Sequence, residues 1–454
     1  KHTQYVSQSS RWHFMYSSFL GGNTYKAGQY LRKYWGEDDA PYDAYAARLD
    51  VTPLDNHVKT TIDIYRSYLW RSAPNRTFGS LADNPFVEGY IKDADYDGQD
   101  IDSFMKTAMD WAMALGHVWI GMDRPNIAAN NAADEIEQGI YAYATMYTPQ
   151  VVTDWKYEKV GVRKQLTYLK VIEATYGDVQ HLKLWYPDRV ETYVVRYDDN
   201  TKAYDQIIEA DVVPNELGKV PFFAITPQKS PVTNMGESIL NDVADVQRSV
   251  YNKLSELEQT IRLSGHPALV KTAETKVTGG AGGIVTIPED MEPGLYPSLL
   301  QPSGSVEAIL AAIKHDIDAI NGMTHLGAIR AVKGSVMSGD AISKERELLN
   351  SKLSDLADIA EEAEIKMWDL WFAWMDITEP EDFLIEYIKT FDTQDPVYEI
   401  SVYQKALETV TNAEYRKYCE KEIAKLTIDD EVILNNILEA IDADSDTPPP
   451  TEVV

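Results

Sequence analysis

Residues 236–264 read GESILNDVADVQRSVYNKLSELEQTIRLS, and this stretch decides how the rest of the chain is interpreted. Its apolar residues recur every three or four positions: Ile239, Val243, Val246, Val250, Leu254, Leu257 and Ile261. At about 3.6 residues per turn, this spacing predicts one narrow apolar stripe on a long helix. Gly265-His266-Pro267 follows and is expected to end the helix, because glycine and proline are typical of helix ends.

Beyond this helix the chain makes an excursion and returns. Residues 266–304 are rich in glycine and proline, with short strand-like pieces. Residues 305–321 repeat apolar side chains at helical spacing and predict a return helix. A glycine-punctuated loop over residues 322–339 then leads into residues 340–376, whose heptad-like pattern predicts a third helix, roughly 50 Å long at about 1.5 Å per residue.

The first half of the chain combines helices with a β-rich part. Apolar periodicity predicts helices over residues 54–70 and after Asp102, and Gly116 is expected to end the second one, before a strand at residues 117–121. Residues 140–226 alternate Tyr, Val, Thr and Ile runs with Asp, Asn and Gly turns, a pattern typical of strands. A strand over residues 383–390 and helices over residues 397–441 are predicted near the C-terminus.

The composition predicts a folded protein that does not coat nucleic acid. The chain has 454 residues, of which 44% are hydrophobic, so it can bury a sizeable core. Its net charge is -30, which opposes tight binding to phosphates but allows DNA to slide past. A single cysteine, Cys419, excludes an internal disulfide and suits a reducing cytosol. We expect neither a secretory leader nor contact with a membrane.

The order of the predicted segments resembles the portal proteins of tailed bacteriophages. Four stretches carry the resemblance: AMDWAMALGHVWI at 108–120, VPFF at 220–223, GES at 236–238 continuing through 253–255, and VMSGDA at 336–341. Each stretch alone is a weak match, and their order along roughly residues 50–390 is the stronger signal.

The resemblance implies an α+β, portal-type subunit. Its parts would be a wing of helices and a β-sheet (1–235), a stem helix (236–264), a clip (265–304), a stem return helix (305–321), a tunnel loop (322–339), a long tunnel helix with a wing strand (340–396), a helical crown (397–443) and a disordered tail (444–454).

The resemblance also implies the function and the partners. About twelve copies would form a ring at one capsid vertex, through which double-stranded DNA is packaged and ejected. The partners would be the large terminase, a head-tail adaptor or tail proteins, and the major capsid and scaffolding proteins. The protein would reside in the virion, and in the host cytoplasm during assembly, with no catalytic residue, cofactor or metal of its own.

Three groups of residues follow as candidates. The clip residues expected to dock the terminase or adaptor are Lys271, Glu274, Lys276, Glu289 and Asp290. The residues expected in subunit packing are Val243, Val250, Leu257, Leu353, Leu356 and Trp371. The segment 321–339 holds two cations, Arg330 and Lys333, and no acid, which suggests contact with the DNA backbone; a loop whose charges do nothing specific is the alternative.

Other patterns favour structural interpretations. Asp93-Ala-Asp95-Tyr-Asp97-Gly98 copies the first half of an EF-hand loop, but Phe104 stands where the bidentate glutamate belongs, so a polar turn before the next helix is expected. The glycine run 279–283 lacks the lysine of a phosphate loop. His117 is expected to be a packed structural residue, and the tryptophans on residues 368–374 are expected in a core or a subunit interface.

Two other function classes stay open at this point. A metal-dependent enzyme acting on nucleic acid would need a cluster of carboxylates and would cleave its substrate with magnesium. A non-catalytic α/β scaffold that binds only proteins would be monomeric or dimeric and would form no channel.

Overall fold

The computed structural model describes the chain except residues 38–43, 126, 128–130, 199, 202, 231–234, 266–267, 274, 278–284, 288–289, 301–305, 331–338, 392–395, 410–411, 429–430 and 444–454. It divides into two compact units, Lys1–Phe391 and Asp392–Val454. The predicted α+β class is confirmed, since helices and antiparallel sheets both occur in the first unit.

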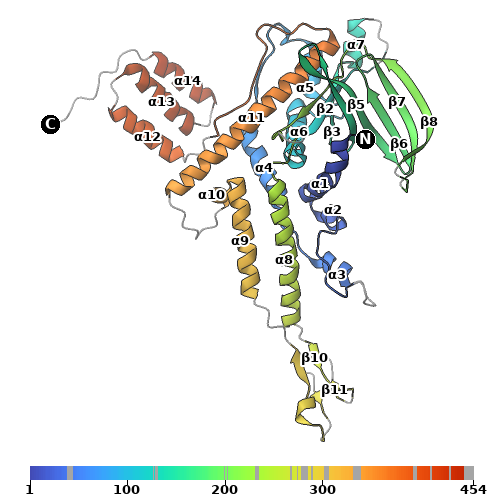
Figure 1. Cartoon of the computed structure of the whole chain (residues 1–454). Coiled ribbons are helices and arrows are strands. Elements are labelled where there is room, and N and C mark those ends of the chain that lie inside the picture. The colour runs from blue at the N-terminus through green and yellow to red at the C-terminus, as the bar shows by residue number, and fades with distance from the viewer. Residues whose placement is uncertain are drawn as a thin grey trace, which may run out of the picture. The chain divides into compact units, whose positions relative to one another are not determined.

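Short helices and small strands make up the first part of the chain (Figure 1). They are α1 (Thr3–Leu20), α2 (Gly22–Ala27), α3 (Ala44–Val51), α4 (His57–Leu69), β1 (Asn75–Thr77), α5 (Pro85–Lys92), α6 (Ile101–Leu115) and α7 (Ala132–Gln138), with a 3-10 turn at Gly79–Leu81. Side-chain caps fix two helix starts, because Asn56 accepts from the Lys59 N–H and Asp100 accepts from the Ser103 N–H. Gly116, at φ 93°, ends α6 as predicted.

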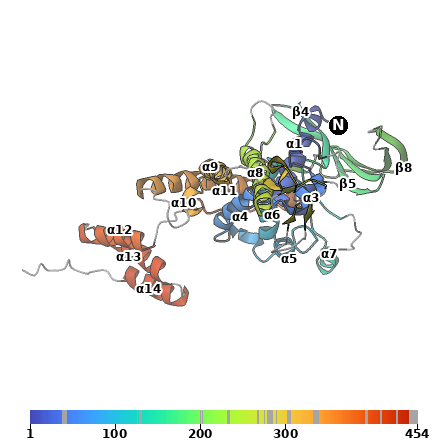
Figure 2. The ribbon, with the colours of Figure 1, turned by 90° about the horizontal axis from the view of Figure 1, so that it is seen from below.

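Two antiparallel sheets occupy the predicted β-rich part. The first has the order β3 (Tyr143–Tyr147), β2 (Val118–Asp123), β9 (Phe222–Ile225), with β2 buried in the centre. The second is a meander of β4 (Val152–Val160), β5 (Arg163–Tyr176), β6 (Val179–Trp185), β7 (Arg189–Asp198) and β8 (Ala203–Pro214). β4 and β8 are therefore the two edges of the second sheet (Figure 2).

The three long helices predicted from periodicity are confirmed. They are α8 (Asn241–Gly265), α9 (Val306–Thr324) and α11 (Gly339–Met375), and a short α10 (Gly327–Arg330) lies in the segment predicted to be a loop. Between α8 and α9 the chain pairs β10 (Ala268–Val270) with β13 (Ser298–Leu300) and β11 (Lys276–Val277) with β12 (Val285–Thr286), next to a 3-10 turn at Pro293–Leu295. After α11, β14 (Leu384–Glu386) returns to pair with β1.

The main core joins these long helices to the small ones. α4 packs against α8 and α11, α6 packs against α4 and α11, and β2 contacts α11. Trp368 and Trp371 are fully buried in α11, while the Trp374 indole donates to the Met122 carbonyl at 2.9 Å, so the expected packing role of the tryptophans is confirmed. A smaller core gathers Trp12, Trp119, Trp155 and Trp185 between α1 and the two sheets.

A buried ion pair ties α11, β1 and α6 to Tyr387, the residue that follows β14. Glu364, on α11, has no exposed surface and receives the Arg76 guanidinium at 2.6 and 3.0 Å. Arg76 also contacts Asp102 at 2.6 Å, and the Tyr387 hydroxyl donates to Glu364 at 2.6 Å. All the oxygens of the buried carboxylate are therefore hydrogen-bonded, which compensates the cost of removing its charge from water.

The second unit consists of helices. They are α12 (Pro396–Thr409), α13 (Ala413–Thr427) and α14 (Glu431–Ala443), each packed on the next, in the region where helices were predicted. Cys419 is buried in α13. The tail that was predicted to be disordered lies outside the described residues.

Candidate functional site

The helix pair α8 and α9 is buried at one end only. Val250 and Tyr251 on α8, and Ile320 on α9, have no exposed surface. Ile261 and Leu310, toward the other end, are 51% and 48% exposed. The Lys253 ammonium meets Asp316 at 2.6 Å and joins the two helices midway. One end of the pair is thus rooted in the core, and the other end carries the β10–β13 excursion (Figure 1).

The root of α8 is held by a contact between two glycines. A Cβ atom added to Gly236 would lie 1.9 Å from the Gly116 carbonyl oxygen, and one added to Gly116 would lie 2.6 Å from the Glu237 carbonyl carbon. The Ser238 hydroxyl donates to the Met113 carbonyl at 2.9 Å and accepts from the Leu240 N–H at 3.1 Å. Two stretches that carry the resemblance, 108–120 and 236–238, therefore meet directly in space.

His117 lies beside this contact and is a packed residue, as expected. Its ring meets the edges of Trp12 and Trp119, with ring centroids 5.6 and 6.3 Å apart. Burial lowers the pKa of His117 to about 4, because an imidazolium would lose its hydration there. The ring is therefore neutral at physiological pH.

The excursion between α8 and α9 carries the predicted docking residues. Lys271 and Lys276 are exposed, although the Lys271 ammonium donates to the Thr275 carbonyl at 2.9 Å. Asp290 is also exposed. Glu274 and Glu289 lie outside the described residues, and the docking role of all five stays a prediction.

Arg330 ends α10 and is half-buried. Its guanidinium donates to Thr61 on α4 at 3.1 Å and more weakly to Asn321 on α9 at 3.4 Å. Burial lowers the pKa of Arg330 from its usual value, yet a guanidinium stays charged at any physiological pH. Lys333 lies outside the described residues. Contact of these two residues with DNA stays a prediction, and the structure adds that the Arg330 guanidinium also bonds α4 and α9 of its own chain.

The predicted packing residues are covered by their own chain. Five of them are buried in the main core: Val243, Val250, Leu353, Leu356 and Trp371. Leu257 is partly buried against the same core. These side chains therefore pack against their own chain, and their role in packing between subunits stays a prediction.

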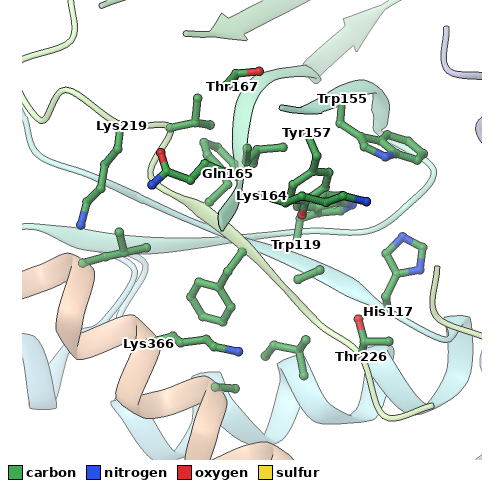
Figure 3. Close-up of a pocket in the computed structure, with 18 of the residues that line it drawn as sticks. His117, Trp119, Trp155, Tyr157, Lys164, Gln165, Thr167, Lys219, Thr226 and Lys366 are labelled. Carbon is green, nitrogen blue, oxygen red and sulfur yellow. The ribbon is translucent and has the colours of Figure 1, made fainter. Parts of the chain in front are cut away.

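A cavity of about 1080 Å³ lies between the β4–β5 hairpin, β9 and the middle of α11 (Figure 3). Sequence reasoning did not find it, because its walls come from segments about 200 residues apart. Its apolar walls include Trp155, Tyr157, Leu166, Phe222, Phe223, Ile359 and Leu370. Four ammonium groups line it as well, those of Lys164, Lys219, Lys229 and Lys366. Burial raises the pKa of Asp369 in the same wall.

The EF-hand-like stretch forms the polar turn that was expected. Asp93 and Asp95 accept hydrogen bonds from the N–H groups of Asp97, Gly98 and Gln99, and the turn leads to the Asp100 cap of α6. Among the described residues no group of three or more His, Cys, Asp or Glu side chains could hold a metal ion. The described helices include none that is long and apolar enough to span a membrane.

Comparisons with known proteins find similarity among solved structures. No family model matches the chain, and no curated protein matches it. Among solved structures, one chain of the "neck of empty GTA particle computed with C6 symmetry" is similar at 10% identity and a TM-score of 0.43, over 86% of this chain and 95% of that chain. So low a TM-score supports no conclusion about the function of this chain.

Proposed function

We propose that this chain is a portal subunit of a tailed phage or phage-like particle. About twelve copies form a ring at one capsid vertex, and double-stranded DNA enters and leaves the capsid through the ring. The excursion at the distal ends of α8 and α9 docks the terminase during packaging and a head-tail adaptor or tail protein afterwards. The subunit itself performs no catalysis.

The observation that carries the proposal is the rooted helix pair with its small β excursion. α8 and α9 are fixed in the core at one end, and the next elements are α10 and the 37-residue α11. This is the order of parts that the resemblance implies for stem, clip, tunnel loop and tunnel helix.

The exposed half of the helix pair supports a ring. Ile261 and Leu310 are large apolar residues that the single chain leaves half-exposed, although the same stripes are buried nearer the root. Covering each such side chain would contribute roughly 1 kcal/mol, since burying a large aliphatic residue completely contributes about 1.5–3 kcal/mol. Neighbouring copies packed side by side would cover them.

The charge supports passage of DNA without retention. Each copy carries a net charge of -30, and a ring multiplies that charge around its channel. An acidic wall repels phosphates, so a duplex would be centred and kept from adhering.

Electron microscopy of the purified chain tests the proposal. We expect end-on views with rotational symmetry, about twelve subunits and a central hole wide enough for a duplex. An Ile261→Asp, Leu310→Asp variant is expected to form fewer rings, while Ile136→Asp, on exposed α7, serves as the matched control. Small asymmetric particles at every salt and protein concentration would overturn the proposal, and magnesium-dependent cleavage of DNA would favour the enzyme instead.

A further inference from the structure

Strand β8 is a long and exposed sheet edge, with two register shifts in its pairing with β7. All twelve of its residues are exposed, and within the described part of the chain no strand pairs with its outer side. Its exposed apolar residues are Tyr204, Ile207, Ile208, Val212 and Val213, with Ile207 61% and Val212 55% exposed. Proteins normally shorten, bend or cover such an edge, because its free N–H and C=O groups can pair with another strand.

The opposite edge of the same sheet is half covered. The backbone N–H of His2 donates to the Thr153 carbonyl at 2.9 Å, and the His2 ring stacks on Trp155 at 4.1 Å. His2 therefore covers the beginning of β4. The rest of β4, Lys156–Val160, is exposed throughout, and Val162 in the following turn is 93% exposed.

The two edges carry opposite charges. β8 holds three acids, Asp205, Glu209 and Asp211, and no cation. The stretch 156–164 around the β4–β5 turn holds four cations, Lys156, Lys159, Arg163 and Lys164, against the single acid Glu158. Such a basic cluster stands out in a chain whose net charge is -30.

We propose that β8 of one copy pairs with the open part of β4 in a second copy, so that the five-stranded sheet continues from subunit to subunit. The inference rests on the proposed ring and names the surface that joins its neighbours. Opposite charges on facing strands stabilise such pairs, whereas pairing β8 with β8 would oppose acid to acid. Because the two surfaces differ and lie on opposite edges of one sheet, the contact is head-to-tail, the kind that closes into rings.

The cavity beneath the hairpin adds a place for side chains of the incoming strand. Tyr157 and Lys164 line the cavity (Figure 3), and so does Val160 in the open part of β4. A strand that combines apolar residues with carboxylates, as β8 does, matches walls that combine aromatic rings with ammonium groups. The main-chain pairing would give affinity, and the cavity would give specificity.

Two charge-reversed variants test the pairing. In the first, Asp205, Glu209 and Asp211 become Lys; in the second, Lys159, Arg163 and Lys164 become Glu. Each reversal turns opposite-charge pairs into like-charge pairs, so each is expected to raise the concentration for half-assembly at least about tenfold. The matched control replaces three exposed acids away from the sheet, Asp83, Glu137 and Glu379, by Lys and is expected to assemble like the wild type.

Mixing the two variants gives the decisive outcome. A chain with a basic β8 can pair only with a chain whose hairpin is acidic, so an equimolar mixture is expected to recover rings with alternating subunits. Native mass spectrometry would detect this as complexes with equal numbers of the two variants. Unchanged circular dichroism of each variant alone would show that folding is intact.

The outcomes separate this inference from the proposed function. If the wild type forms rings and both variants form them equally well, or if the mixture does not recover assembly, the strand pairing is wrong and the portal proposal stands. Assemblies that respond to charge reversal and mixing but never form rings would support the pairing and contradict the portal. A wild type that stays monomeric overturns both.

Discussion

The contact between Gly116 and Gly236 makes a quantitative prediction about the root of α8. A methyl group on Gly236 would lie 1.9 Å from the Gly116 carbonyl oxygen. To bring these two atoms to an ordinary van der Waals distance, the two backbones would have to separate by more than about 1 Å. Gly116 also sits at φ 93°, where a side chain is strained even without neighbours. Gly139 has a comparable φ of 65°, but nothing lies within 4 Å of an added Cβ.

Alanine substitutions at these three glycines separate the free-energy cost of backbone strain from the cost of the close contact. Gly139→Ala introduces only backbone strain, for which about 1 kcal/mol of the free energy of unfolding is expected to be lost. Gly236→Ala introduces only the close contact, and since the obstacle is backbone the loss should reach the upper part of the usual range for overpacking, about 3 kcal/mol. Gly116→Ala combines both and is expected to cost about 4 kcal/mol.

Urea unfolding followed by tryptophan fluorescence measures these losses. All ten tryptophans lie before residue 375, so the signal reports on the unit Lys1–Phe391 alone. The expected order of midpoints is wild type, Gly139→Ala, Gly236→Ala and then Gly116→Ala. If Gly116→Ala and Gly236→Ala unfold no earlier than Gly139→Ala, the two backbones do not touch and the reasoning is refuted.

Three further predictions concern single sites. Glu364→Ala leaves a buried guanidinium without its partner and should lower the free energy of unfolding by about 3–5 kcal/mol. Tyr387→Phe removes only one hydrogen bond and should lower it by about 1–2 kcal/mol. Equal losses for the two variants in urea titrations would contradict the buried ion pair. Burial holds the pKa of His117 at about 4, so between about pH 6.5 and 4 the unfolded chain binds a proton that the folded chain does not. The free energy of unfolding should therefore decrease, by up to about 3 kcal/mol, as the pH is lowered through this range. His117→Phe should remove this part of the pH dependence when unfolding is measured at several pH values. Arg330→Ala with Lys333→Ala should reduce DNA packaging or retention while rings still form in electron micrographs, and unchanged filling would remove the predicted DNA contact.

Periodicity was enough to find the three long helices α8, α9 and α11, because it records which face of a helix is buried. The predicted helix at 236–264 nevertheless begins at Asn241, since residues 236–238 are fixed by Gly116 and Met113 from another part of the chain. No pattern within 236–240 reports that contact. The predicted return helix likewise runs on to Thr324, whose carbonyl accepts from the Tyr65 hydroxyl at 2.7 Å.

The candidate sites could be predicted from the sequence less well than the helices. The apolar stripe of α8 predicts burial but not the elements that bury it. In the structure Val243 and Val250 are buried, and α8 packs against α9, α4 and α1 of the same chain. α10 was missed because four residues contain no full period, and it places Arg330 against Thr61 on α4. The cavity, whose walls come from two sheets and α11, has no signature in any one segment.

Charged residues, by contrast, can be counted in the sequence directly. Which of them lie on the same sheet edge is known only once the strand order is known. The three acids of 203–214 and the four cations of 156–164 are ordinary in the sequence, about fifty residues apart. The meander places them on opposite edges of one sheet, where a second copy can bring them together but the chain itself cannot. A closed barrel would have paired these edges within one chain and removed any reason for complementary charge between copies. An open sheet with opposite charges on its two edges therefore favours repetition of the chain, and this reason for assembly does not depend on the apolar stripes of α8 and α9.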